Sequence, residues 1–228
     1  MKLLAIYLLT MTLLDINSDS YKSNKKVSVD GSSLNDTTFS NLQNIDIQFM
    51  LRGYFYASSS IEDNSAPGGF GGSDNKAKEI SQNKLLESTH GLKLIIDTTA
   101  NVGFAERFKG QKAYLINRLG SDTAFEASDS RLSIVAEAFY KGSWNPIEYL
   151  PSSWCGNSYH KVYLKNNEYW EFNVPRYLGQ TKVKLRYRLD AGEGSLMYSN
   201  EVTAFINKKQ FSVKQGYSPN GIMAPYND

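Results

Sequence analysis

The most reactive side chains of this sequence lie in one short segment, residues 154–160, which contains Cys155 and His160. Cys155 is the only cysteine of the chain, and His160 is one of its two histidines. A thiolate beside an imidazole is the nucleophile–base pair of one class of hydrolase. An extended chain would hold the two side chains about 16 Å apart, whereas a turn at Gly156 and Asn157 would bring them together. Cys/His-dependent catalysis therefore requires the chain to fold back here.

A soft metal is a second chemical use for the same residues. Cys155, His160 and the distant His90 could supply three ligands to zinc or copper. No His-x-His or Cys-x-x-Cys spacing supports this arrangement. The sequence favours a structured loop at 151–157, in which Trp154 and an inert, buried Cys155 fill an edge of the core. We therefore expect no catalytic residue, no metal and no cofactor, and keep a Cys155/His160 enzyme or metal protein as an alternative.

Four cationic side chains alternate along one predicted strand and would share one of its faces. They are Lys182, Lys184, Arg186 and Arg188. This basic stripe could bind an anionic polysaccharide or a negatively charged partner. The alternative is an ordinary solvent-facing side, because charged side chains also discourage edge-to-edge pairing of sheets.

Aromatic residues are the other indication of binding, since the chain has 15 tyrosines, 11 phenylalanines and three tryptophans. Aromatic rings pack on the apolar faces of sugars and are frequent at the centres of protein interfaces. The candidates for an exposed stacking surface are Trp144, Trp154, Tyr159, Tyr163, Tyr169 and Tyr177. We expect Trp154, Tyr159 and Tyr169 to bind the ligand together with the basic stripe. The competing interpretation places the tryptophans in the core.

The elements that position these residues have the period of β-strands. Val183, Leu185, Tyr187 and Leu189 alternate with the basic stripe, as expected for a strand with one buried face. Trp170, Phe172 and Val174 also share one face of a strand. Short strands separated by turn signals, without a strand–helix–strand rhythm, predict an all-β, antiparallel β-sandwich.

The last strands carry a resemblance to known folds. The runs at 168–175, 181–189 and 198–202 resemble the final strands of immunoglobulin-like and fibronectin-type-III-like sandwiches, with Ser199-Asn200-Glu201-Val202 similar to the entry into the last strand of the latter. Together with the leader, this layout also resembles uncharacterised secreted bacterial β-sandwich proteins. The resemblance implies an immunoglobulin-like fold and no active site. The single cysteine excludes antibody-type domains with their disulfide.

The first twenty residues have the layout of a secretory signal peptide. Lys2 precedes an apolar run at 3–14, and polar and small residues follow. Such a run is shorter than the roughly 20 residues that span a bilayer, and no later apolar stretch is long enough. The sequence predicts a signal peptide at 1–20, a polar flexible arm at 21–43, the sandwich at 44–215 with a long loop at 58–80 and a short helix at 76–87, and a C-terminal tail at 216–228.

These features predict a secreted protein, periplasmic or extracellular, that works by surface contact. The net charge of +2 gives no strong field to attract nucleic acid. We expect a non-catalytic protein that binds a glycan or a cell-surface protein. A further alternative is a structural subunit of a surface assembly, whose arm at 21–43 pairs with the sheet edge of a neighbour.

Overall fold

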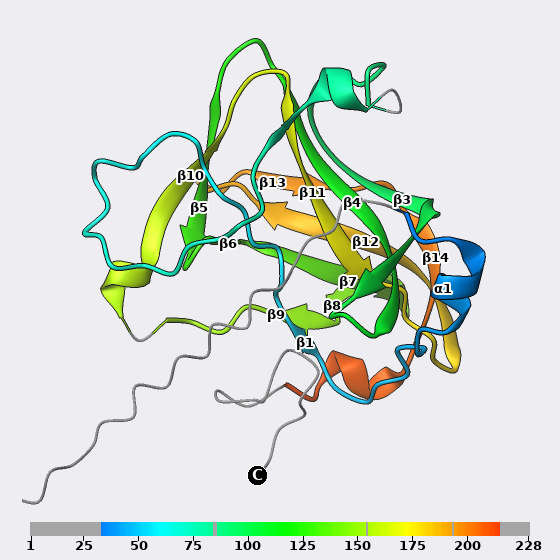
Figure 1. The fold of residues 1–228 in the computed structure, drawn as a ribbon. Helices are drawn as coiled ribbons and strands as arrows, with labels where there is room; N and C mark the ends of the chain where they lie inside the picture. The colour runs from blue at the N-terminus through cyan, green and yellow to red at the C-terminus, as the bar shows by residue number, and fades with distance from the viewer. Residues whose placement is uncertain (1–32, 84–85, 154, 193, 215–228) are drawn as a thin grey trace, which may run out of the picture.

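A computed structural model describes residues 33–83, 86–153, 155–192 and 194–214 of the chain (Figure 1). The predicted signal peptide, most of the predicted arm, the predicted tail and Trp154 lie outside these residues. The described residues form mostly antiparallel strands with little helix. The all-β class predicted from the sequence is therefore confirmed.

Within the described residues, no α-helix lies between two strands along the chain. The strands are β1 (Leu51–Arg52), β2 (Lys78–Glu79), β3 (Gly91–Phe104), β4 (Phe108–Arg118), β5 (Thr123–Ser128), β6 (Arg131–Leu132), β7 (Ile134–Tyr140), β8 (Ser143–Pro146), β9 (Glu148–Tyr149), β10 (Tyr159–Leu164), β11 (Glu168–Pro175), β12 (Thr181–Asp190), β13 (Leu196–Tyr198) and β14 (Val202–Ile206). The helices are α1 (Asp36–Ser40) and the 3₁₀ turns η1 (Ile80–Gln82), η2 (Gly156–Ser158) and η3 (Lys208–Phe211).

Two larger sheets carry most of the strand residues. One has four strands in the order β2-β11-β4-β3, and the other has five, with β13 and β14 both paired to β12 in the order β13-β12-β7-β8. A smaller sheet has the order β10-β5-β6, and β1 pairs with β9 in parallel. Long hairpins such as β3–β4 hold neighbouring segments of the chain side by side (Figure 1).

The β12 strand confirms the alternation predicted from its sequence. Its residues Val183, Leu185, Tyr187 and Leu189 are all buried, and the intervening residues point away from the core. The opposite residues of β7 and β14 follow the same parity, since Leu185 pairs in register with Ala138 and Val183 with Ala204. One face of the five-stranded sheet is thus buried in the core.

The core joins the two larger sheets through aromatic rings. Phe55, fully buried in the segment after β1, contacts Phe172 of the four-stranded sheet with ring centroids 4.9 Å apart. It also contacts Tyr187 of the five-stranded sheet at 5.1 Å. The buried apolar residues of both sheets form one continuous cluster. Burial of such aromatic surface stabilises the contact between the two sheets.

The described part of the predicted N-terminal arm, residues 33–43, contains a short helix. Residues 36–40 form helix α1, capped by the Asn35 side chain, which accepts a 2.8 Å hydrogen bond from the amide of Thr38. The ring of Phe39 lies beneath the cations of Lys109 and Arg176. One helix cap and the contacts of the Phe39 ring therefore place this polar segment against β4 and the residue after β11.

The helix predicted at 76–87 does not form in the described part of that segment. Lys78 and Glu79 instead pair with Tyr169 and Glu168 of β11, and only one 3₁₀ turn follows. Pairing with a sheet edge supplies the backbone with hydrogen bonds that a single short helix cannot match. Among the described residues, no helix is long and apolar enough to cross a membrane.

Candidate functional site

The basic stripe lies on the outward side of β12, but its four cations have different surroundings. Lys182 and Lys184 are exposed, and Lys184 Nζ lies 2.9 Å from Glu201 Oε2. Arg186 and Arg188 are half-buried, and both bind one carboxylate, that of Glu137 on β7, at 3.0 and 2.7 Å. The stripe is therefore partly neutralised by the protein itself.

Aromatic rings flank the guanidinium of Arg186. Its central carbon lies 4.1 Å from the ring centroid of Trp144 on β8 and 3.8 Å from that of Tyr198 on β13. The Trp144 ring in turn contacts Phe139 at 5.4 Å. A guanidinium between two aromatic faces is held by cation–π attraction as well as by its ion pair. Glu137 and the two rings therefore fix Arg186 in one orientation.

Exposed apolar side chains surround this group on the same side of the sheet. Phe205 pairs in register with Lys182, and Phe139 pairs with Lys184, so their side chains share the outward face. The exposed fractions are 40% for Phe139, 42% for Tyr198, 42% for Phe205 and 47% for Leu196. We define the outer face of β12 by the residues Phe139, Trp144, Lys182, Lys184, Arg186, Arg188, Leu196, Tyr198 and Phe205. It combines apolar side chains with a small excess of positive charge.

The aromatic residues predicted to complete the binding surface lie elsewhere. Tyr159 is 49% exposed but belongs to β10 in the three-stranded sheet. Tyr169 is 3% exposed, because η1 and Leu86 cover it in a small cluster where it meets Tyr114. Trp154 lies outside the described residues. The structure thus brings neither Tyr159 nor Tyr169 to the basic stripe, and Tyr169 is a buried residue rather than a stacking position.

Sequence reasoning missed Phe139, Leu196, Tyr198 and Phe205 as members of this face. A signal was present in the parity of β7, because the alternating buried residues Ala136 and Ala138 leave Phe139 on the polar side. An aromatic residue at an outward position of an alternating strand is the unusual feature. The pairing of β13 with β12 also had a local signal, because the two strands form a hairpin across a short connection that contains Gly192 and Gly194.

The Cys/His pair is not assembled in the described structure. Cys155 is exposed, which corrects the expectation of a buried, inert cysteine. His160 is 5% exposed, and its hydrogen bonds and ring contact go to Ser130, Ser158 and Phe70 rather than to the thiol. Within the described residues, no group of three or more His, Cys, Asp or Glu side chains could hold a metal ion.

A buried carboxylate, that of Glu148 on β9, lies at the centre of the core. Its Oε1 accepts hydrogen bonds from the hydroxyls of Tyr54 at 2.8 Å and Tyr177 at 2.6 Å, and its Oε2 accepts one from the amide of Ala136 at 2.9 Å. Burial raises the pKa of Glu148 to about 7, although these hydrogen bonds act in the opposite direction. Burial, followed by the neighbouring carboxylate, raises the pKa of Tyr177 well above its usual value.

The hydroxyl of Tyr187 completes this network. It lies 2.8 Å from that of Tyr54, and because Tyr54 donates its proton to Glu148, Tyr187 is the donor of that bond. Glu148 and Tyr187 are at most 1% exposed and Tyr177 is 4% exposed, whereas Tyr54 is partly exposed. The network is therefore part of the core and is no candidate for contact with a ligand.

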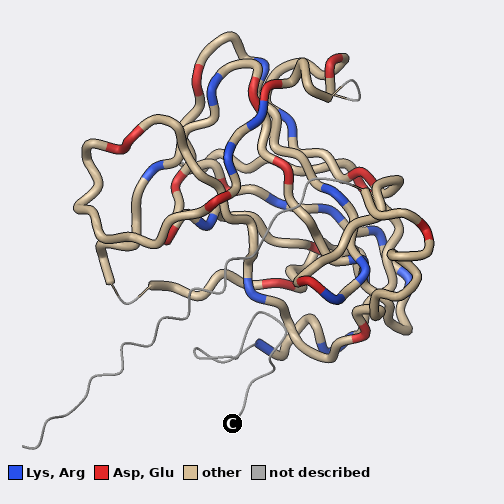
Figure 2. Tube along the Cα trace, viewed as in Figure 1, with Lys and Arg blue, Asp and Glu red and all other residues tan. Residues whose placement is uncertain are grey.

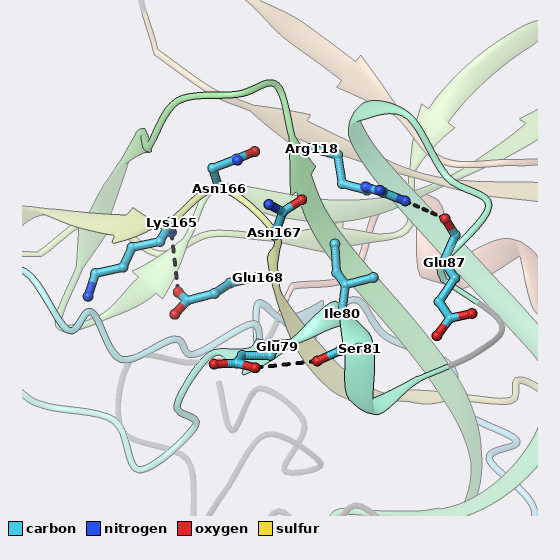
Figure 3. Close-up of a pocket in the computed structure, with 9 residues that line it drawn as sticks. All are labelled: Glu79, Ile80, Ser81, Glu87, Arg118, Lys165, Asn166, Asn167 and Glu168. Atoms are coloured by element: carbon cyan, nitrogen blue, oxygen red, sulfur yellow. Dashed lines mark hydrogen bonds between the residues drawn. The ribbon is translucent and has the colours of Figure 1, made fainter.

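A polar pocket of about 520 Å³ lies between η1 and the β10–β11 connection, beside the end of β4 (Figure 3). Its lining carries the carboxylates of Glu79, Glu87 and Glu168 and the cations of Arg118 and Lys165. The guanidinium of Arg118 donates to the backbone oxygens of Glu87 and Thr89, and Glu168 Oε2 accepts a 3.3 Å hydrogen bond from the Lys165 amide. The pocket is thus lined by charges of both signs, and its Arg118 and Glu168 side chains form hydrogen bonds with the backbone of neighbouring loops.

Both signs of charge are also distributed over the described chain as a whole (Figure 2). This distribution gives no single-sign field that would select a polyanion at long range. No protein-family model, no curated protein and no solved structure matches this chain. Within the described residues, the outer face of β12 brings exposed aromatic side chains together with cationic ones.

Proposed function

We propose that this chain is a secreted, non-catalytic β-sandwich protein of the immunoglobulin-like kind, which uses the outer face of β12 to bind a cell-surface protein. The observation that carries the proposal is the position of Arg186 between the rings of Trp144 and Tyr198, on a face that also exposes Phe139, Leu196 and Phe205. Arginine, tryptophan and tyrosine dominate the energetics of protein interfaces. The leader at 1–20 supports secretion.

The composition of the face favours a protein partner over a glycan. Phe139, Leu196 and Phe205 offer no hydrogen-bonding group, whereas the hydroxyls of a sugar lose water on binding and need polar partners. Arg186 also occupies one face of both the Trp144 and Tyr198 rings. The same apolar side chains match the apolar centre of a protein interface.

The positive charge that the protein leaves unpaired on this face indicates which charges a partner would carry at the rim of the interface. Glu137 neutralises part of the Arg186 and Arg188 pair, and Glu201 accompanies Lys184. Lys182, opposite Phe205, adds an exposed cation beside an exposed ring. A partner with an apolar centre and carboxylates at its rim fits this arrangement, and moderate salt would slow its association more than it would abolish binding.

The described part of the N-terminal arm, residues 33–43, gives no support to the alternative of an assembly subunit. Residues 33–43 lie against the chain's own β3 and β4, through the bond from the Leu34 amide to the Asn101 oxygen and the bridge of Gln43 with Phe108. This packing of the described part of the arm on its own chain favours the binding function over the assembly function.

The experiment is binding of the mature chain, residues 21–228, to a panel of intact animal and bacterial cells and to a glycan array. The variants are Tyr198→Ser and Phe205→Ser on the face, and Tyr159→Ser is the matched control on β10. We expect cell binding to fall at least about tenfold in both face variants and to stay unchanged in the control. Protease treatment of the cells should abolish it.

Two outcomes would contradict the proposal. Equal binding by the face variants and the wild type would show that the outer face of β12 does not contact the partner. Binding that survives protease and is lost after glycosidase treatment, or a hit on the array, would identify a glycan as the ligand. Circular dichroism and thermal unfolding of each variant show whether the substituted chain is still folded.

A further inference from the structure

Strand β10 lies at the edge of the three-stranded sheet, and among the described residues no strand pairs with its outer side. Edge strands present backbone amides and carbonyls on which a strand of another chain can add. The amides of Tyr159, Lys161 and Tyr163 point away from β5, since each donates to a group outside that strand. Tyr159 donates to the backbone oxygen of Gly156 in η2. What bonds the other two amides decides whether this edge can pair.

Two side chains of the loop after Phe55 cap these amides. The amide of Lys161 donates a 2.8 Å hydrogen bond to Asp63 Oδ2. The amide of Tyr163 donates a 3.0 Å hydrogen bond to Ser59 Oγ. We call residues 59–63 the edge cover. It bonds the donors of β10 with side chains, at the positions where a neighbouring strand would place backbone oxygens.

The edge cover orients both capping side chains by local hydrogen bonds. Ser59 Oγ accepts a 3.1 Å bond from the amide of Ile61 and donates a 2.6 Å bond to the oxygen of the same residue. Asp63 Oδ1 accepts a 3.0 Å bond from the amide of Ser65. Both side chains are therefore fixed within the loop, which lowers the entropy cost of capping the strand.

The edge cover supplies acceptors to β10 but no donors. A residue of an antiparallel strand directs its amide and its carbonyl to the same side, so the oxygens of Lys161 and Tyr163 also lie on this edge. Among the described residues, no hydrogen bond from outside the sheet reaches either oxygen. The Ser59 hydroxyl donates its proton to Ile61, and an ionised Asp63 has no proton to donate. A second strand would bond both the amides and the carbonyls.

The side chains of β10 favour a second copy of the same strand in one register. With a twofold axis at Val162, antiparallel pairing places Lys161 opposite Tyr163 of the second copy, and each such pair exchanges two backbone hydrogen bonds. An ammonium opposite a tyrosine ring is a favourable cross-strand pair. An axis at Lys161 would oppose two lysines, and an axis at Tyr163 would oppose Lys161 and Lys165, both of which are unfavourable. Registers shifted farther overlap fewer residues of the strand.

We propose that β10 is an interaction strand for a second copy of this chain, and that the edge cover prevents this pairing through Ser59 and Asp63. Displacement of the cover joins two three-stranded sheets into one continuous sheet, and backbone oxygens replace the two capping side chains. The overlap is confined to residues 160–164, so the dimer is weak. The proposal is independent of the function proposed for the outer face of β12, which belongs to another sheet.

The experiment compares the mass in solution of the mature wild-type chain with that of Ser59→Ala/Asp63→Ala, by sedimentation equilibrium. We expect a monomeric wild type and an average mass that rises towards about twofold in the variant at about 0.2 mM protein. Ser60→Ala/Glu62→Ala is the matched control, because both residues are exposed members of the edge cover. It should remain monomeric. Circular dichroism and thermal unfolding show whether each variant is folded.

A third substitution tests whether β10 itself makes the contact. Tyr163→Lys, added to Ser59→Ala/Asp63→Ala, opposes a lysine to Lys161 of the second copy and should return the mass to that of a monomer. Tyr198→Lys, added to the same pair, changes the outer face of β12 instead and should leave the dimer intact. This control separates the edge of β10 from the surface that the proposed function uses.

Disulfide capture tests the register. In a chain with Cys155→Ser and both cover substitutions, Lys161→Cys mixed with Tyr163→Cys should crosslink, because directly paired strand residues lie within disulfide reach. Each cysteine variant alone should crosslink far less.

A monomeric Ser59→Ala/Asp63→Ala variant would overturn the proposal, and so would a wild type that dimerises equally well. A dimer that survives Tyr163→Lys, or equal crosslinking by each cysteine variant alone, would reject pairing through β10 in this register.

Discussion

The hydroxyl of Tyr177 donates a 2.6 Å hydrogen bond to the carboxylate of Glu148 in the centre of the core. Tyr177 follows β11 of the four-stranded sheet, whereas Glu148 lies on β9, where its Oε2 also accepts from the amide of Ala136 on β7. This carboxylate thus ties together segments that are far apart in the sequence. Its burial is costly in the ionised form, which gives the fold a dependence on pH.

We predict that Glu148 makes the protein less stable as the pH rises through neutrality. Its pKa is raised from 4.5 to about 7 by burial, so the folded state holds the proton more tightly than the unfolded state. The resulting contribution is fully present below pH 4.5 and is lost as pH rises through 7. Its size is on the order of 3 kcal/mol. Urea unfolding at pH 5, 7 and 9 measures it.

The variant Glu148→Gln isolates this contribution from other titrating groups. Its free energy of unfolding should fall less between pH 5 and pH 9 than that of the wild type. Glu126→Gln, at an exposed position on β5, is the control and should follow the wild type. Parallel curves for Glu148→Gln and the wild type would show that the core carboxylate does not set the pH dependence.

The bond from Tyr177 should matter most when Glu148 is ionised. Tyr177→Phe removes a donor that lowers the pKa of Glu148, so it penalises the carboxylate more than the protonated acid. We expect a loss of about 2 kcal/mol in the free energy of unfolding at pH 8, and a smaller loss at pH 5. Tyr56→Phe, at a 38% exposed tyrosine, is the control. An equal loss at both pH values would indicate a packing effect.

Asn200 should connect β3 to the segment after β13. Its side chain accepts a 2.7 Å hydrogen bond from the amide of Ile96 and donates a 3.1 Å bond to the oxygen of the same residue. Asn200→Ala should lower the free energy of unfolding by about 1–2 kcal/mol and speed hydrogen exchange at Ile96. Asn145→Ala, whose amide bonds only within its own hairpin, should cost under about 0.5 kcal/mol. Unchanged exchange at Ile96 would refute the connection.

Gly179 allows the chain before β12 to pass close to the end of β14. A Cβ at this position would lie 2.6 Å from the oxygen of Ile206 and 2.7 Å from the amide nitrogen of Asn207, so backbone would have to move. Gly179→Ala should therefore lower the free energy of unfolding by about 1–3 kcal/mol or more. Gly72→Ala, where an added Cβ meets nothing within 4 Å, is the control. Thermal unfolding compares the two variants, and equal stability would contradict the close approach.

The all-β class and the buried side of β12 could be read from the sequence because both depend on local periodicity. The alternation at 182–189 appears unchanged in the structure, with Leu185 and Tyr187 inside and the cations outside. A strand with one buried face imposes this period on its own residues. The positions of these residues along the chain are therefore enough to predict which of them are buried.

The candidate site depended on contacts that no local pattern contains. Tyr169 alternates with the core residue Trp170 along β11, so its position predicted an exposed side chain, yet η1 and Leu86 bury it. The sequence predicted Arg186 and Arg188 as cations on an exposed strand face, whereas the pairing of β7 with β12 places Glu137 against both of them. The chain distance between these partners is about fifty residues, and only strand pairing brings them together.

The sequence by itself therefore determined the strand period, the leader-like start and the inward face of β12, since each is a property of neighbouring residues. Only the tertiary structure decided which outward residues are exposed, where Arg186 is held and how His160 is buried against Phe70. The physical reason is that burial and pairing depend on side chains from distant segments. Those segments meet only when their apolar faces leave water together.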